Sequence, residues 1–348
     1  MSLARRILPL FIPHLGCGHN CVFCSQRSIS GHTEPVTPAS VAEALASLSR
    51  PVDELAFYGG SFTALPLSAQ EGYLSAAAPF LQKGVIRAIR VSTRPDAVSV
   101  PALEQLRRYG AETVELGAQS MDDAVLRVSG RGHSAEDTAQ AAARLRRFGF
   151  RVILQMMTGL PGSSPERDFR TGEALAALRP DGVRIYPTVI LRDTPLYDLW
   201  RRGEYREHTV SDAVEICARL LPLFESKGIP VIRLGLNPTD ALSAGQAAGG
   251  AYDPALGEKV RSRIYLEKAR ALLRRGGYGA CAVLGVCKSD VSQLIGQRRC
   301  NLEALRTEFH LERLSVRPAE LPRGEVALLE AKGTAREDRS DRNTRPLP

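Results

Sequence analysis

Three cysteines lie within eight residues near the N-terminus, at Cys17, Cys21 and Cys24. A closed structural zinc site usually takes four ligands, so this group is one thiolate short. An iron–sulfur cluster needs three protein thiolates when one of its irons stays open for a ligand that comes from a substrate. Phe23, which precedes the last cysteine, would give such a cluster an apolar wall. The spacing therefore predicts an open iron–sulfur site.

The alternative is a zinc knuckle in which a histidine supplies the fourth ligand. Three histidines are close enough in the sequence to do so, namely His14, His19 and His32. We favour the cluster because a zinc knuckle leaves the unusual residues after the later strands unexplained.

Short apolar runs alternate with amphipathic helical patterns along the chain, and this alternation predicts strands separated by helices. We expect strands at residues 6–12, 54–58, 87–92, 113–116, 151–156, 183–189 and 230–234. The helices expected between them include 38–48, 68–81, 101–109, 135–148 and 212–226. Parallel strands with helical crossovers result from such an alternation.

Residues that are unusual for plain connections follow successive predicted strands. They are Cys17 to Cys24, Gly59 and Gly60, residues 92–94, Gln119 with Ser120, and residues 159–162. Barrel enzymes build their active sites at this carboxyl rim. The sequence therefore predicts an α/β fold, a partial (β/α)6-type TIM barrel.

The pattern changes past residue 240, and the positive charge is concentrated there. From Glu258 onward 19 Lys and Arg stand against 12 Asp and Glu, a surplus of seven out of the net charge of +8. We expect a barrel domain at 1–240, a smaller basic α+β unit at 241–332 that binds RNA, and a disordered tail at 333–348.

Cysteine usage and hydropathy indicate where the protein works. An odd count of seven cysteines without an export signal argues against a disulfide framework. No apolar run reaches the length of a membrane span, so we expect a cytoplasmic protein without a membrane partner. For the four cysteines outside the N-terminal loop we expect ordinary packing rather than a second cluster: Cys217, Cys281, Cys287 and Cys300.

The Cys-x3-Cys-x2-Cys spacing, with an aromatic residue before the last cysteine, resembles the signature of the radical S-adenosylmethionine (SAM) superfamily. Four further strings, 114–120, 129–133, 154–162 and 184–189, resemble the radical domain of the Elongator catalytic subunit, and more weakly oxygen-independent coproporphyrinogen oxidase. The likeness runs from about Phe11 to Trp200. No part of the chain after residue 240 resembles the acetyltransferase domain of the Elongator subunit.

The resemblance implies a 4Fe-4S cluster on the three cysteines and a role for each matching residue toward SAM. Gly59, Gly60 and Ser61 would bind the amino group, although Ser61 stands where the family more often has an acidic residue. The other implied contacts are Gln119, Gln155 and Ser92 with the ribose, Arg131 with the carboxylate, and Phe23 and Met157 with the adenine. Tyr186 would be catalytic, relaying a hydrogen or orienting the substrate.

The implied activity is reductive cleavage of SAM to a 5′-deoxyadenosyl radical, which removes a hydrogen atom from RNA, with tRNA as the expected substrate. A one-electron donor such as flavodoxin or ferredoxin would be a partner. Two alternatives remain open, which are oxidation or decarboxylation of a porphyrin-like small molecule and a non-catalytic iron–sulfur redox sensor.

One further string, 291–305, resembles the Ile-Gly-x-x-Gly turn of KH domains, with Arg299 in place of the second glycine.

Overall fold

The computed structural model describes residues 6–12, 15–18, 21–25, 36–239 and 242–332. The histidines of the zinc alternative and the predicted tail at 333–348 lie outside these ranges. The chain divides into two compact units, residues 1–257 and 258–348. No helix in the described part is long and apolar enough to cross a bilayer.

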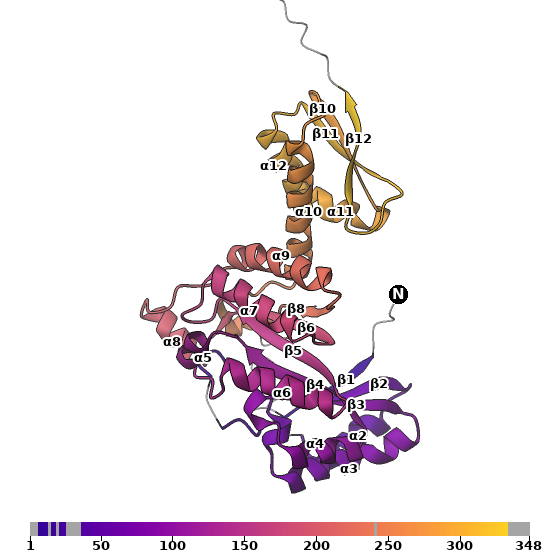
Figure 1. Ribbon diagram of the computed structural model, residues 1–348, viewed down its shortest axis with the longest axis vertical. Coiled ribbons are helices and arrows are strands. Elements are labelled where there is room, and N and C mark those ends of the chain that lie inside the picture. Colours follow the sequence, from indigo (N-terminus) through magenta and orange to yellow (C-terminus); the bar gives the residue numbers. More distant parts are fainter. Residues whose placement is uncertain (1–5, 13–14, 19–20, 26–35, 240–241, 333–348) are drawn as a thin grey trace, which may run out of the picture. The chain divides into compact units, whose positions relative to one another are not determined.

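The first unit is built on a seven-stranded sheet in the order β1-β2-β3-β4-β5-β6-β8, with every neighbouring pair parallel. Its strands are β1 (Ile7–Phe11), β2 (Val52–Tyr58), β3 (Ile86–Thr93), β4 (Ala111–Gln119), β5 (Arg151–Thr158), β6 (Gly182–Pro187) and β8 (Val231–Leu234). The sheet curls into a half-barrel, which confirms the predicted partial barrel (Figure 1).

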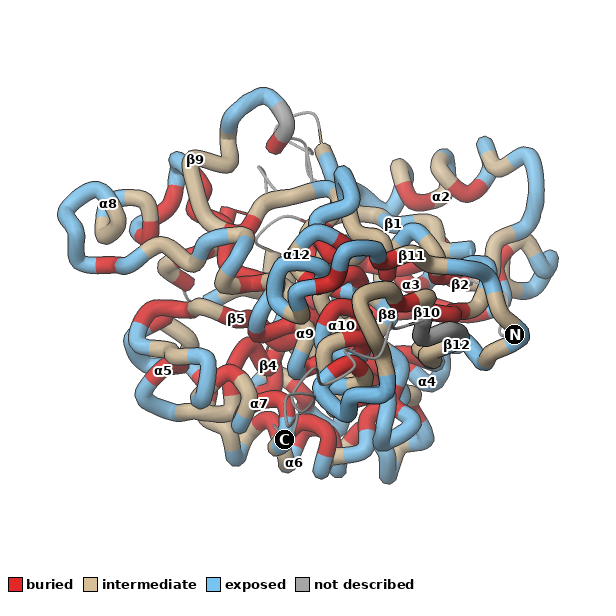
Figure 2. Tube along the Cα trace, turned by 90° about the horizontal axis from the view of Figure 1, so that it is seen from above, coloured by how far each residue is buried: buried red, intermediate tan, exposed pale blue. Residues whose placement is uncertain are grey.

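Helices connect these strands, and most of them cover the outer face of the sheet (Figure 1). They are α2 (Pro38–Ala46), α3 (Leu67–Gln82), α4 (Val100–Arg108), α5 (Asp123–Val128), α6 (Ala135–Arg147), α7 (Pro165–Ala177), α8 (Pro195–Arg201) and α9 (Val210–Ser226). Caps fix where several begin: Ser134 and Asp137 form a reciprocal capping box at α6, and Thr209 and Asp212 form one at α9. Figure 2 shows that the buried positions follow the strands, above all β4 and β5.

The structure differs from the predicted organisation at two places. The expected strand 183–189 is divided into β6 and β7 (Val189–Leu191), and β7 leaves the large sheet to pair antiparallel with β9 (Ala247–Gly250). Because β9 is tied to the barrel in this way, the first unit continues to Gly257 instead of ending at residue 240.

The second unit is a three-stranded sheet with helices, as the predicted α+β unit requires. Its elements are α10 (Leu256–Arg274), which begins at the boundary, β10 (Cys281–Val286), α11 (Val291–Ile295), α12 (Cys300–Glu308), β11 (Arg313–Pro318) and β12 (Val326–Lys332). β10 is central, parallel to β11 and antiparallel to β12. Leucines from α10, α12 and β10, among them Leu273, Leu284 and Leu305, form one core.

Candidate active site

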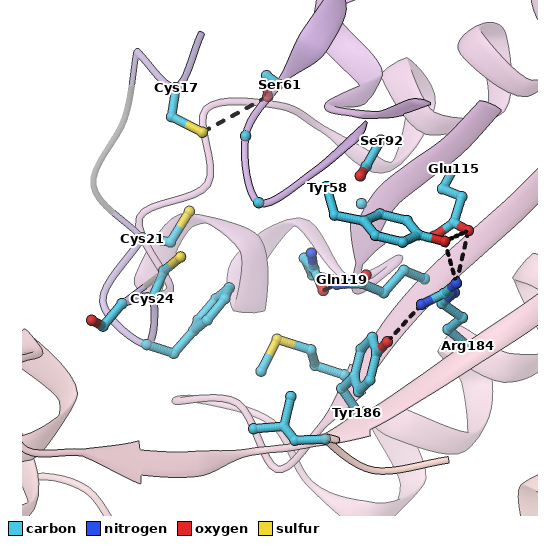
Figure 3. A pocket seen from close by; sticks show the side chains of 18 of the residues that line it. Cys17, Cys21, Cys24, Tyr58, Ser61, Ser92, Glu115, Gln119, Arg184 and Tyr186 are labelled. Atoms are coloured by element: carbon cyan, nitrogen blue, oxygen red, sulfur yellow. Dashed lines mark hydrogen bonds and ion pairs between the residues drawn. The ribbon is translucent and has the colours of Figure 1, made fainter. Parts of the chain in front are cut away.

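The carboxyl ends of the parallel strands surround a cavity of about 730 Å³. Every site residue predicted from the sequence lines it: Cys17, Cys21, Phe23, Cys24, Gly59, Gly60, Ser61, Ser92, Gln119, Arg131, Gln155, Met157 and Tyr186. These residues come from segments far apart in the chain, and parallel pairing of the strands brings them together. Figure 3 shows the cysteines at one end of the cavity and Tyr58, Arg184 and Tyr186 at the other.

The cysteine loop packs tightly against the end of β2. A Cβ atom added to Gly60 would lie 2.3 Å from the carbonyl oxygen of Leu15 and 2.6 Å from that of Ile12. The backbone N–H of Ser61 donates to the Leu15 carbonyl at 2.9 Å, and Cys17 Sγ lies 3.9 Å from Ser61 Oγ. The glycine at position 60 is therefore needed for the close approach of the loop, whatever it contributes to a ligand.

Two other segments hold the second half of the loop. The Val22 N–H donates to Ser129 at the end of α5, and the Val22 carbonyl accepts from Leu196 in α8. Cys21 and Phe23 share an apolar cluster with Met157 and Leu196, among others. The cysteine loop is thus held by α8, which begins after its Thr194 cap.

Arg131 reaches the cavity beside the cysteines. One guanidinium nitrogen lies 3.2 Å from Cys21 Sγ, a second donates to the Gly117 carbonyl at 2.7 Å, and the buried Nε has no hydrogen-bond partner among the described residues. No carboxylate of the described chain pairs with this side chain. Burial, and then the charge of Arg131, lowers the pKa of the nearby His133 to about 4, so that imidazole is neutral at pH 7.

The two glutamines lie in the middle of the cavity. A bulge between Gly117 and Gln119 interrupts the β4 ladder, and Gln119 has a φ of 63°, which is unusual for a residue other than glycine. Gln155 donates to Gln119 Oε1 at 3.3 Å. Met157 and Tyr186 are neighbours in the register of β5 and β6.

A buried charge network that the sequence analysis missed lies under the far end of the cavity. Arg90 binds both Glu54 and Glu115, with 2.6 Å between its nitrogen and Glu115 Oε1. Glu115 also pairs with Arg184 at 2.9 Å. Two guanidinium groups and two carboxylates make this network neutral overall. Each member lies on an otherwise apolar strand, on the face of the sheet that points into the barrel. Side chains of a strand alternate between its two faces, so a polar residue at every second position is the sequence signal of such an inner face.

The network orients two tyrosines differently. Arg184 donates to Tyr58 at 2.8 Å and to Tyr186 at 3.1 Å. Tyr58 donates its own proton to Glu115 at 3.1 Å, and burial together with the charge of Glu115 raises the pKa of Tyr58. Tyr186 only accepts within the described residues, so its O–H proton is left for a molecule in the cavity (Figure 3).

No three His, Cys, Asp or Glu side chains in the described ranges are grouped so as to hold one metal ion. Of the remaining cysteines, Cys217 is buried in α9, as expected. Cys281 and Cys287 stand at opposite ends of β10, about 20 Å apart at the rise of a strand. Cys300 is exposed, so the packing interpretation is wrong for that residue.

Comparisons with known proteins identify the family of the chain. Residues 11–171 match the radical SAM superfamily model, and residues 180–265 match the radical SAM C-terminal domain model. Human Elongator complex protein 3 is 30% identical over 257 residues, which cover 61% of this chain and 47% of that protein. The chain thus spans about half the length of the curated relatives it matches.

Two archaeal comparisons extend this similarity. The tRNA uridine(34) acetyltransferase of Methanocaldococcus infernus is 31% identical over 50% of this chain and 37% of its own length. The solved structure of M. infernus Elp3 aligns with a TM-score of 0.59 and 25% identity, covering 77% of this chain and 64% of that one. With two domain models that together match most of the chain, and with three cysteines at the head of a half-barrel, this chain belongs to the radical SAM superfamily.

Proposed function

We propose that this protein is a radical SAM enzyme that modifies a nucleobase in RNA, with tRNA as the substrate. Membership of the superfamily makes it an enzyme whose cofactors are a 4Fe-4S cluster and SAM. When bound, these cofactors supply a 5′-deoxyadenosyl radical that removes a hydrogen atom from an otherwise unreactive carbon. The sensor alternative is not supported.

The residues of the cavity fit these cofactors. Three thiols line one end, and Cys17, Cys21 and Cys24 would hold the cluster. Among the described residues, the buried Nε of Arg131 has no hydrogen-bond partner, and no carboxylate pairs with its guanidinium group. The group is therefore suited to bind the carboxylate of SAM. Gln119, Gln155 and Ser92 offer neutral polar groups for ribose hydroxyls, and Phe23 and Met157 an apolar wall for adenine.

The far end of the cavity carries the proposal for the substrate. Its charged groups neutralise one another, and the hydroxyl group of Tyr186 lines the cavity at this end. A nucleobase hydrogen-bonds through its edge without carrying a charge, so it suits this end. The printed name of the archaeal relative, a tRNA uridine(34) acetyltransferase, points to the same class of substrate.

The porphyrin alternative fits less well. A porphyrin with several carboxylates needs several unpaired cations, whereas the described arginines of this cavity are occupied. Arg94 pairs with Asp96 and Arg184 with Glu115, and Arg131 is assigned to SAM.

Nucleoside analysis of RNA tests the proposal. tRNA from a strain that lacks this gene should lose one modified nucleoside, and the purified protein with SAM, a reductant such as reduced flavodoxin, and that tRNA should restore it. Identical nucleoside profiles in the presence and absence of the gene would contradict an RNA substrate.

Tyr186→Phe is expected to reduce formation of the modified nucleoside by about 10²-fold, the usual effect of losing a positioned proton-transfer group. SAM cleavage without RNA should continue, because Tyr186 lies at the substrate end. Tyr58→Phe is the matched control, since the Tyr58 proton is held by Glu115. Product and 5′-deoxyadenosine measured by mass spectrometry check both statements, and equal effects of the two variants would remove the special role of Tyr186.

Gly60→Ala is expected to lower SAM cleavage by about 10²-fold, because the new methyl group would displace the cysteine loop by the order of an ångström. Gly18→Ala lies in the same loop and is the control, since its added Cβ would meet no atom within 4 Å. The rate of 5′-deoxyadenosine formation compares the two. A Gly60→Ala protein as active as Gly18→Ala would show that the loop tolerates the shift.

A further inference from the structure

The C-terminal unit carries a second surface, which the radical chemistry does not use. In this unit two parallel strands, β10 and β11, enclose two helices, α11 and α12, joined by a short loop at Gly296–Arg299. The chain therefore runs strand, helix, loop, helix, strand. KH modules present a loop of this kind between two helices and clamp a nucleic-acid backbone with it.

Close contacts inside the unit hold the loop from below. Gly296 has a φ of 76°, and a Cβ atom there would lie 2.7 Å from Cys300 Sγ and 2.9 Å from Asn301 Cγ. Asn301, at the start of α12, is buried and donates to Ser262 in α10 and to the Gln293 carbonyl in α11. The loop is thus anchored from beneath before any ligand binds, which lowers the entropy cost of binding.

The loop also carries positive charge that the rest of the unit does not neutralise. Arg298 and Arg299 are both exposed, and neither pairs with a carboxylate in the described part of the chain. By contrast, four arginines elsewhere in the unit pair with acidic side chains: Arg263, Arg270, Arg274 and Arg323. Two adjacent unpaired guanidinium groups on a rigid loop suit phosphates.

We infer that the loop Gly296–Arg299 binds the phosphate backbone of single-stranded RNA and so helps to hold the substrate of the active site. This inference rests on the proposed RNA substrate. The exposed residues of the loop, Gln297 to Cys300, include no large apolar side chain of the kind that inserts into a membrane surface. Phosphate contacts of this kind position RNA without reading its sequence.

The test measures binding of the full-length protein to a fluorescent 12-nucleotide oligouridylate over a range of salt concentrations. The double variant R298Q/R299Q should bind more weakly and should flatten the slope of log Kobs against log salt by about 1.4, since each phosphate contact with a single strand contributes about 0.7. The control R275Q/R313Q removes two exposed, unpaired charges near the amino end of β10, away from the loop. It should leave the slope near that of the wild type.

A wild-type slope in R298Q/R299Q, or equal flattening in the two double variants, would overturn the inference. So would a loss of binding to anionic lipid vesicles in R298Q/R299Q without any change toward RNA. SAM cleavage without RNA, measured on the same preparations, should be unchanged in both variants. If the wild-type protein modifies tRNA but R298Q/R299Q keeps the wild-type slope, the inference about the loop is wrong while the proposed function stands.

Discussion

Cys17→Ala is expected to abolish both the iron–sulfur cluster and reductive cleavage of SAM. With one thiolate missing, a second iron loses its protein ligand. Ser61 Oγ lies 3.9 Å from Cys17 Sγ, but a hydroxyl is a much poorer iron ligand than a thiolate. Iron content and 5′-deoxyadenosine formation after anaerobic reconstitution measure the two losses.

Cys300→Ala is the matched control for this experiment. Cys300 is exposed and belongs to the other compact unit, so its removal should change neither iron content nor SAM cleavage. A Cys17→Ala protein that keeps the visible absorption of the cluster, or a Cys300→Ala protein that loses it, would contradict the assignment of ligands.

Glu115→Ala is expected to lower the free energy of unfolding by about 3–5 kcal/mol, the cost of removing one partner from a buried ion pair. Its carboxylate accepts from Arg90, Arg184 and Tyr58, and both its side chain and that of Arg90 are almost completely buried. Without it, Arg184 loses its carboxylate partner and Arg90 keeps only Glu54. Denaturant titration of the unfolding transition measures the change.

The exposed pair Arg202–Glu204 provides the comparison. Both side chains are more than half exposed, so Glu204→Ala should leave the denaturation midpoint unchanged within error. A Glu115→Ala protein as stable as Glu204→Ala would show that the buried network relaxes without Glu115.

The cysteine spacing and the positions of polar residues after strands were enough to predict the half-barrel and the residues that line its cavity. Both are local patterns whose consequence is fixed by parallel pairing, which places Ser92, Gln119 and Met157 at one edge. The assignment of each residue to a part of SAM stays a prediction from the family resemblance.

The buried network was not predicted because each of its members looks like a strand residue with a charge of its own. Glu54, Arg90, Glu115 and Arg184 lie on four strands, and only the register of the sheet shows that their charges cancel. The pairing that ties β9 to the first unit was not predicted for a similar reason. The pairing of β9 with β7 joins residues about sixty positions apart, and no local sequence pattern predicts it.

Electron paramagnetic resonance of the reduced protein, with and without SAM, tests the central claim most directly. Iron analysis of the same protein should give about four irons per chain. The spectrum of the reduced cluster should change when SAM is added, because one iron is open to bind SAM. Bound zinc in place of iron, or a cluster spectrum that SAM leaves unchanged, would contradict the account.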